Sequence, residues 1–84
     1  MDSVGRIRER RVTEVRAEMI GTCWRVLARE GQRVAVDDIL VILESMKMEI
    51  PVPAPVAGSV RSVLAREGEV VQEGQVLVVI DGDG

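Results

Sequence analysis

Few residues in this sequence can carry chemistry, and one of them is unique. The 84 residues include no His and no Tyr, Cys23 is the only cysteine, and Lys47 is the only lysine beside ten arginines. The usual general bases, nucleophiles and metal ligands are therefore nearly all missing, so we expect neither self-contained catalysis nor a metal site. The primary amine of Lys47 is the side-chain group best suited to covalent modification.

The segment around Lys47 predicts a tight hairpin turn with an unusual composition. Met46 and Met48 flank the lysine, and a tight turn cannot bury both, so flexible apolar side chains are presented to water where Ser, Asn, Asp or Gly is usual. Exposed apolar groups around a unique amine indicate a recognition surface. Glu44 and Glu49 are further recognition candidates, with ordinary hairpin solubility as their alternative role.

The chain contains an internal repeat. Shifting the sequence by 37 residues aligns residues 27–31 with residues 64–68 without a mismatch, and 10 of the 24 positions from Gly21 to Glu44 match their counterparts. Each copy reads as an extended apolar stretch, an Arg-Glu-Gly turn, a short Val-containing stretch, a second turn and a five-residue apolar run. The repeat therefore predicts four short strands in each copy and eight in all.

Several single positions have a predicted structural role. Gly31 and Gly68 end the two Arg-Glu-Gly turns, where a positive φ is expected, and Gly58 is also interpreted as structural. Cys23 aligns with a valine at an inward position, so we expect a buried thiol. Trp24, the only aromatic residue, aligns with an arginine, so we expect it to be partly exposed.

The strand that opens each copy is predicted from alternation of apolar and polar residues. Inward positions of these two strands are Val15, Ala17 and Met19 in the first copy and Val52, Ala54 and Val56 in the second. The strand after Lys47 is expected to be stiff and to lie at a sheet edge, because prolines remove backbone donors at three alternate positions: Pro51, Pro53 and Pro55.

Two copies of about 30 residues cannot each bury an apolar face alone. We therefore expect an all-β fold in which two four-stranded halves pack as a sandwich or flattened barrel about a pseudo-twofold axis. Such an axis places both chain ends at one end of the domain and Lys47 at the other. The expected organisation is a charged N-terminal arm over residues 1–12 and one domain over residues 13–84.

The Glu-Ser-Met-Lys-Met-Glu segment of residues 44–49 closely resembles the attachment motif of biotinyl domains in biotin-dependent carboxylases. The resemblance extends over residues 13 to 81 and includes the repeat. It implies a flattened β-barrel of the barrel-sandwich hybrid type, with biotin joined to Lys47 as an amide and with Met46 and Met48 as the flanking methionines. Related lipoyl domains usually carry Asp before and Ala after their lysine, so biotin is favoured over lipoate.

The resemblance also implies a function. The chain is expected to be a non-catalytic biotin carboxyl carrier, loaded by a biotin protein ligase because a protonated amine does not acylate itself. The carrier then shuttles a carboxyl group between a biotin carboxylase subunit and a carboxyltransferase subunit of a biotin-dependent, acyl-CoA-type carboxylase. Two alternatives remain at this stage: a lipoyl carrier of an oxidative multienzyme complex, and an unmodified β interaction module whose basic arm binds an acidic partner.

Charge and hydropathy predict the surroundings of the protein. Residues 1–16 carry five arginines and three acids, whereas residues 17–84 carry six bases and eleven acids. No nucleic-acid partner is expected, because the body is acidic and no aromatic residue is interleaved with the arginines. No apolar run exceeds five residues and the single cysteine cannot form an internal disulfide, so we expect no signal peptide, no membrane partner and a cytoplasmic location.

Overall fold

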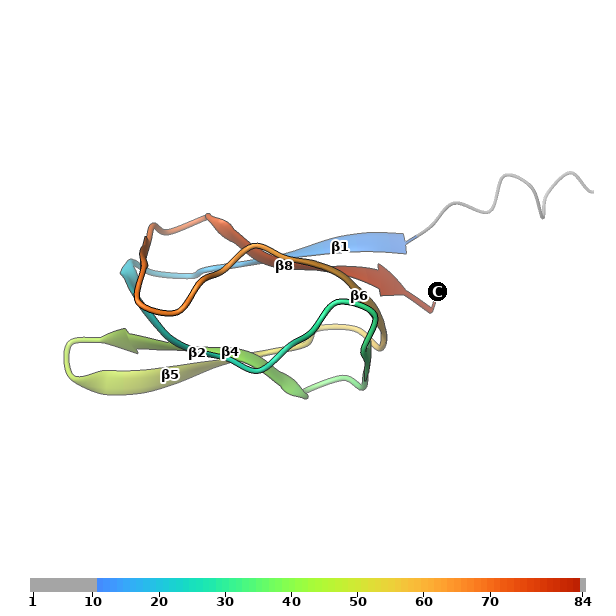
Figure 1. Ribbon diagram of the computed structural model, residues 1–84, viewed down its shortest axis with the longest axis horizontal. Coiled ribbons are helices and arrows are strands. Elements are labelled where there is room, and N and C mark those ends of the chain that lie inside the picture. The colour runs from blue at the N-terminus through green and yellow to red at the C-terminus, as the bar shows by residue number, and fades with distance from the viewer. Residues whose placement is uncertain (1–10, 84) are drawn as a thin grey trace, which may run out of the picture.

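The computed structural model describes residues 11–83, and this part of the chain is all-β, as predicted (Figure 1). It contains no helix long and apolar enough to cross a membrane. The eight predicted strands are present, with β3 and β7 reduced to two residues each. The strands are β1 Arg11–Arg16, β2 Gly21–Val26, β3 Arg33–Val34, β4 Ile39–Ser45, β5 Met48–Pro53, β6 Gly58–Val63, β7 Val70–Val71 and β8 Val76–Gly82.

The strands form two four-stranded antiparallel sheets whose orders are β1-β8-β6-β3 and β5-β4-β2-β7. The sheets lie one above the other in Figure 1. Each sheet takes two strands from each copy of the repeat, since β1 to β4 belong to the first copy and β5 to β8 to the second. The predicted halves therefore interleave, and neither copy forms a sheet by itself.

The apolar runs at the end of each copy supply the centre of the core. Leu40, Val41 and Leu43 of β4 are at most 1% exposed, and their counterparts in β8 are fully buried. Burial on this scale removes the β-branched and Leu side chains from water and holds the two sheets together. The β8 counterparts are Leu77, Val78 and Ile80.

Hydrogen bonds between the copies repeat the pseudo-twofold relation. The Gly31 amide donates to the Val60 carbonyl at 2.8 Å, and the Gly68 amide donates to the Cys23 carbonyl, also at 2.8 Å. Both glycines have positive φ, 85° and 92°, which confirms the prediction made from the Arg-Glu-Gly turns. Each turn is therefore tied to a strand of the other copy.

The opening strand of the first copy is shorter than its alternation predicts. Val15 and Ala17 are buried as expected, but Met19 is 41% exposed, so its predicted inward position is wrong. The physical reason is that β1 ends at Arg16, so Met19 lies in the β1–β2 loop, beyond the strand whose faces alternate.

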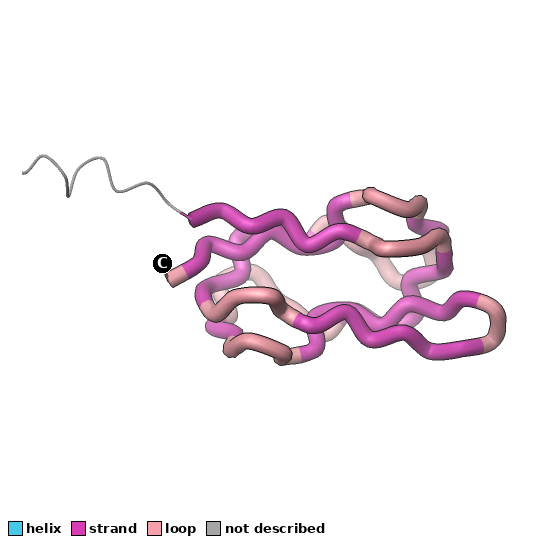
Figure 2. Tube along the Cα trace, turned by 180° about the vertical axis from the view of Figure 1, so that it is seen from behind, coloured by secondary structure: helices cyan, strands magenta, loops and turns pink. Residues whose placement is uncertain are grey.

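The two described ends of the chain lie at one end of the domain, and the β4–β5 hairpin lies at the other (Figure 2). This arrangement follows the predicted axis. β1 begins at Arg11, which pairs with Gly82, so the sheet starts two residues before the predicted domain boundary. The rest of the predicted arm, residues 1–10, lies outside the described residues.

The buried thiol predicted for Cys23 is present. Cys23 is fully buried and unpaired. Burial raises the pKa of this thiol, and the nearby carboxylates Glu67 and Glu69 raise it further because they disfavour a thiolate. Cys23 is therefore an inert part of the core rather than a reactive nucleophile.

The raised pKa of Cys23 predicts a pH effect. The native state keeps the thiol proton where the unfolded chain begins to lose it, so its contribution is complete below the unfolded pKa of about 8.5 and falls as pH rises further. The wild type should lose free energy of unfolding relative to Cys23→Val between about pH 7 and about pH 10. Urea denaturation of both proteins checks this, and parallel curves would contradict it.

Gly58 and Gly21 occupy equivalent positions but differ in space. A Cβ on Gly58 would lie 2.1 Å from the Asp81 carbonyl oxygen, whereas one on Gly21 would lie 2.9 Å from that of Glu44. Gly58→Ala should therefore cost roughly 1–3 kcal/mol through overpacking, and more than Gly21→Ala. Urea midpoints of the two variants give the comparison, and equal losses would refute it.

Candidate functional site

The turn that carries Lys47 has the geometry of a two-residue hairpin. Ser45 of β4 pairs with Met48 of β5, and Met46 and Lys47 form the turn between them. Their φ angles are 52° and 65°, the positive pair that a type I′ turn requires. The predicted hairpin tip is confirmed, but it is made from residues that disfavour positive φ, where Asn-Gly is usual.

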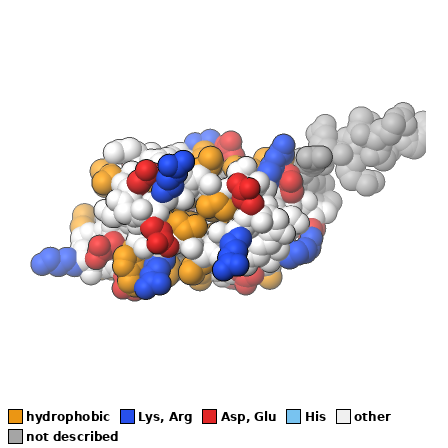
Figure 3. Space-filling view, in the orientation of Figure 1, with side chains coloured by type: hydrophobic (Ala, Val, Ile, Leu, Met, Phe, Trp, Pro, Cys, Tyr) orange, Lys and Arg blue, Asp and Glu red, His pale blue; other side chains and the backbone are white. Residues whose placement is uncertain are grey.

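The side chains at the tip project into solvent. Met46 is 90% exposed and Met48 is 63% exposed, as expected of a turn too tight to bury them. Lys47 is also exposed, and no residue in the range 11–83 forms an ion pair with it. Figure 3 shows blue, cationic side-chain atoms projecting at the hairpin end of the molecule. The amine is therefore accessible to a partner enzyme from several directions.

The β1–β2 loop is held against the base of the hairpin. The Ser45 hydroxyl donates to the Ile20 carbonyl at 3.1 Å. In the second copy, the carbonyl equivalent to that of Ile20 belongs to Ala57 and accepts from the Asp83 amide at 3.0 Å. The position equivalent to Asp83 is Met46, which lies in the turn, so a side-chain donor here replaces a backbone one.

This contact brings two further exposed apolar residues to the end of the domain that carries Lys47. Ile20 is 55% exposed and Met19 is 41% exposed. The sequence did not predict the exposure of either residue. The alternation of apolar and polar residues placed Met19 inward, and the residue that aligns with Ile20 in the second copy gave no indication that Ile20 is exposed. The one indication of this contact in the sequence was Ser45, a polar residue that stands where the second copy has Gly82.

Glu44 and Glu49 lie directly opposite each other on β4 and β5, and both are exposed. Like charges at opposite positions of an antiparallel pair are destabilising. Within residues 11–83 neither carboxylate has an ion pair. The two predicted recognition carboxylates are therefore brought together beside the turn and left available to a partner.

β5 is an edge strand, as its prolines predict. Pro51 pairs with Ile42 and Pro53 with Ile39, so β5 keeps its pairing to β4 while offering fewer donors along its free edge. This arrangement stiffens the strand that leaves the hairpin and discourages a further strand from adding to the edge.

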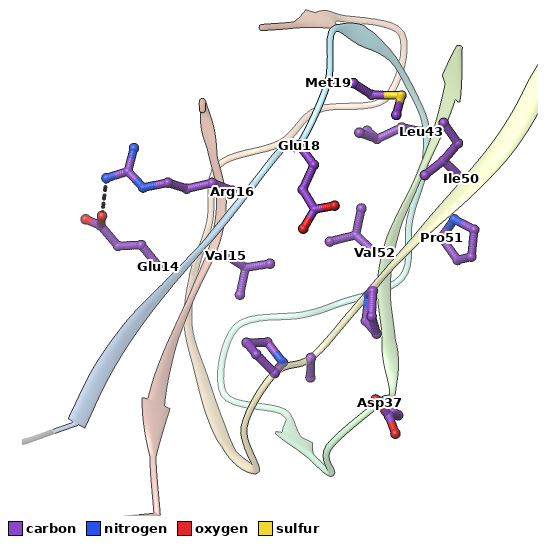
Figure 4. A pocket seen from close by; sticks show the side chains of 13 residues that line it. Glu14, Val15, Arg16, Glu18, Met19, Asp37, Leu43, Ile50, Pro51 and Val52 are labelled. Atoms are coloured by element: carbon purple, nitrogen blue, oxygen red, sulfur yellow. Dashed lines mark hydrogen bonds and ion pairs between the residues drawn. The ribbon is translucent and has the colours of Figure 1, made fainter. Parts of the chain in front are cut away.

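A groove of about 410 Å³ opens between the edges of the two sheets, β1 and β5 (Figure 4). Its lining is mainly apolar and includes Val15, Ile50 and Val52, and the Glu18 side chain points into the space between Val15 and Val52. No His, Cys or Lys lines it.

A comparison with known protein families agrees with the fold and the hairpin described above. A family model described as biotin-requiring enzyme, covering biotin- and lipoyl-attachment domains, matches residues 13–80. The chain belongs to this family. The matched residues include both copies of the repeat and the Lys47 hairpin, so the match covers the fold and the motif together. We call this part of the chain the biotinyl domain.

Individual relatives agree with the family. The biotinyl domain is 53% identical over 47 residues to a biotinylated protein TB7.3 homolog of Mycobacterium leprae. The aligned segment covers 56% of this chain and 66% of that protein. The chain thus spans about two thirds of that relative's length. A single-chain, multi-domain long-chain acyl-CoA carboxylase superposes with a TM-score of 0.80 and 37% identity, over 84% of this chain and 7% of that one.

A second solved structure shows the same fold. Urea carboxylase of Kluyveromyces lactis superposes on the biotinyl domain with a TM-score of 0.78 and 32% identity, over 82% of this chain and 6% of the other. Each carboxylase contains the fold as a small part of a much longer chain.

The positive φ angles of the turn predict a gain in stability from one substitution. Asn tolerates the left-handed region better than Met, so Met46→Asn should raise the free energy of unfolding by up to about 1 kcal/mol. Met48→Asn, in the extended strand, is the matched control and should lower it or leave it unchanged. Urea denaturation distinguishes the two, and a loss at position 46 would contradict the strain argument.

Proposed function

We propose that this chain is a biotin carboxyl carrier and that Lys47 is the residue to which biotin is attached. The observation that carries the proposal is the position of the only lysine. Its side chain is exposed at the tip of a strained hairpin, between two exposed methionines, in a chain of the biotin-requiring family. Strain is retained at functional sites, and here the fold holds the amine away from the body.

The attachment is an amide. The Nζ atom of Lys47, once deprotonated, attacks the carbonyl carbon of the valeryl carboxyl group that the ligase has activated, and the activating group leaves with one carboxyl oxygen. Biotin and lysine together therefore lose the atoms of one water. The turn itself contains no general base and no carboxyl-activating group, so a biotin protein ligase supplies both. The exposure of Lys47 and the absence of an ion pair to it within residues 11–83 fit this requirement.

Recognition by the ligase falls to the residues around the lysine. Met46 and Met48 offer adaptable apolar contact, because their side chains are flexible and mostly exposed. Glu44 and Glu49 add two carboxylates on one face of the hairpin. We assign all four residues to recognition, with the methionines making the larger contribution.

The rest of the domain acts as a support. Bound biotin supplies a ureido nitrogen that accepts and releases a carboxyl group. The rigid sandwich below Lys47 keeps the arm concentrated near two active sites, those of a biotin carboxylase subunit and a carboxyltransferase subunit. We therefore assign no catalytic residue to the chain itself and place it in the cytoplasm with those partners.

The carboxyl acceptor is proposed to be an acyl-CoA. This choice is supported by the likeness to a long-chain acyl-CoA carboxylase, which has the higher identity of the two solved structures compared above. A carrier does not itself select the acceptor, because the acceptor binds to the carboxyltransferase. The proposal therefore concerns the complex that the domain serves, not a pocket in this chain.

Attachment is tested by intact mass after co-expression with a biotin ligase. The wild type should gain the mass of one biotin less one water, and Lys47→Arg should fold, keep its charge and gain nothing. Glu18, an exposed residue on the β1–β2 loop, offers a control in Glu18→Lys, which adds a second lysine near the site. That control should still gain only one biotin.

Other masses would change the assignment. An unchanged wild-type mass would overturn the carrier proposal, and a gain of lipoyl size would reassign the chain to lipoyl carriers. A gain that persists in Lys47→Arg would place the attachment elsewhere. Two increments on Glu18→Lys would show that the ligase reads exposure alone and not the turn.

A further inference from the structure

The groove between β1 and β5 reaches the end of the domain that carries Lys47. Met19, Leu43 and Ile50 all line it, and Figure 4 shows these three side chains gathered at one of its ends. Leu43 of β4 pairs with Ile50 of β5, two residues from the pair that closes the hairpin turn. Met19 belongs to the β1–β2 loop, which the Ser45 hydroxyl holds against the base of the hairpin. These three residues therefore form a mouth of the groove at the base of the hairpin.

An apolar path leads from the lysine to this mouth. Met48, Ile50 and Val52 point to one face of β5, because side chains two residues apart on a strand share a face. Ile50 and Val52 line the groove, and Met48, which follows Lys47 directly, is 63% exposed. A flexible group attached to Lys47 can therefore turn back along β5 over apolar side chains.

One carboxylate enters this mainly apolar space. The Glu18 side chain points between Val15 and Val52 in Figure 4, and none of the ion pairs formed within residues 11–83 includes it. Two other charged residues of the lining, Glu14 and Arg16, pair with each other. A carboxylate accepts hydrogen bonds and donates none, so Glu18 favours a neutral, largely apolar ligand that brings its own N–H donor.

A biotinyl group attached to Lys47 has this chemistry. Its thioether ring and its valeryl chain are apolar, and its ureido group carries N–H donors. The groove, at about 410 Å³, falls within the roughly 300–1,000 Å³ that is usual for small-molecule sites. The groove therefore matches the biotinyl group in polarity and in size.

The tether is also long enough to reach the groove. Ile50 follows Lys47 by three residues, which is roughly 10 Å along an extended strand. By ordinary bond lengths, an extended biotinyl-lysine side chain carries its ring roughly 13 Å from the Cα atom of the lysine. The ring can therefore reach the mouth with slack left for the arm to turn.

We infer that this groove holds the chain's own biotinyl group between reactions, with the ring packed against Met19 and Ile50 and a ureido N–H donated to the Glu18 carboxylate. This inference rests on the proposed function. The contact is intramolecular, so the tether raises the effective concentration of the ring and even a weak site is occupied. Retraction, the return of the arm to the groove, lowers the fraction of biotin that is free to enter a partner enzyme.

Two neighbouring residues of the β1–β2 loop supply the test. Met19 and Ile20 are 41% and 55% exposed, but Ile20 is not among the residues that line the groove. Met19→Glu replaces the apolar contact at the mouth with a second carboxylate and should release the arm. Ile20→Glu is the matched control, because it adds the same charge to the same loop away from the groove. Each protein is biotinylated by co-expression with a ligase, and its intact mass is checked for one biotin.

The first readout is the rate of capture by streptavidin, which encloses only a biotin ring that is free of the groove. Retraction reduces this rate in proportion to the free fraction, so Met19→Glu should be captured about threefold faster than the wild type, or more. Glu18→Ala, which removes the acceptor of the ureido N–H, should also be captured faster, and Ile20→Glu should match the wild type. A wild-type rate for Met19→Glu or Glu18→Ala, or an equal acceleration in Ile20→Glu, would rule the inference out.

A second readout needs no binding partner. The wild type, labelled with ¹³C at its methionine methyl groups, is compared after biotinylation and after acetylation of Lys47, which forms the same kind of amide without the ring. Biotinylation alone should shift the Met19 signal and give it nuclear Overhauser contacts to the ring. A Met19 signal that is identical in the two proteins would also refute retraction. A wild type that gains no biotin would instead overturn the proposed function, so the two failures are distinguishable.

Discussion

The structure depends on hydrogen bonds that each copy of the repeat makes to the other. The Gly31 amide reaches a carbonyl of β6 and the Gly68 amide reaches one of β2, so the tight turn of each copy closes on a strand of its counterpart. Because the two central strands of each sheet come from one copy and the two outer strands from the other, one copy alone would leave both its strand edges and its apolar face open to water. The domain is thus stable only as the interleaved pair, and its pseudo-twofold axis follows from that necessity.

The axis explains how a chain so short presents a single reactive group. Interleaving brings the described chain ends together and leaves the connection between the copies at the opposite end. That connection cannot follow the rule of the repeat, since its counterpart is a pair of ends rather than a turn. Met46 and Lys47 adopt positive φ there, and the Ser45 hydroxyl supplies the donor for the Ile20 carbonyl. The site is therefore located where the symmetry has to be broken.

Much of this was predictable from the sequence, because the repeat marks the strands, the turn glycines and the hairpin of Lys47. The exchange of strands between sheets was not, since the 37-residue period describes what each copy contains and not where its strands pair. The exposure of Met19 was mispredicted because β1 ends at Arg16, so Met19 lies in a loop to which the alternation of strand faces does not apply. Likewise, Glu44 and Glu49 lie opposite each other because of the register of β4 on β5. The length of the turn fixes that register, and the length was known only from the structure.

A repeat of this kind separates what the backbone requires from what individual side chains contribute. Positions that match across the axis, such as Gly31 with Gly68, are explained by backbone geometry in both copies. Positions that differ while the backbone stays the same are not explained in that way. Trp24 and Arg61 occupy equivalent β-bulges of β2 and β6, yet only the arginine neutralises a neighbouring carboxylate. Trp24 instead lies under the Arg25 guanidinium, 4.9 Å from the ring centroid, so the two equivalent bulges are stabilised by different neighbours.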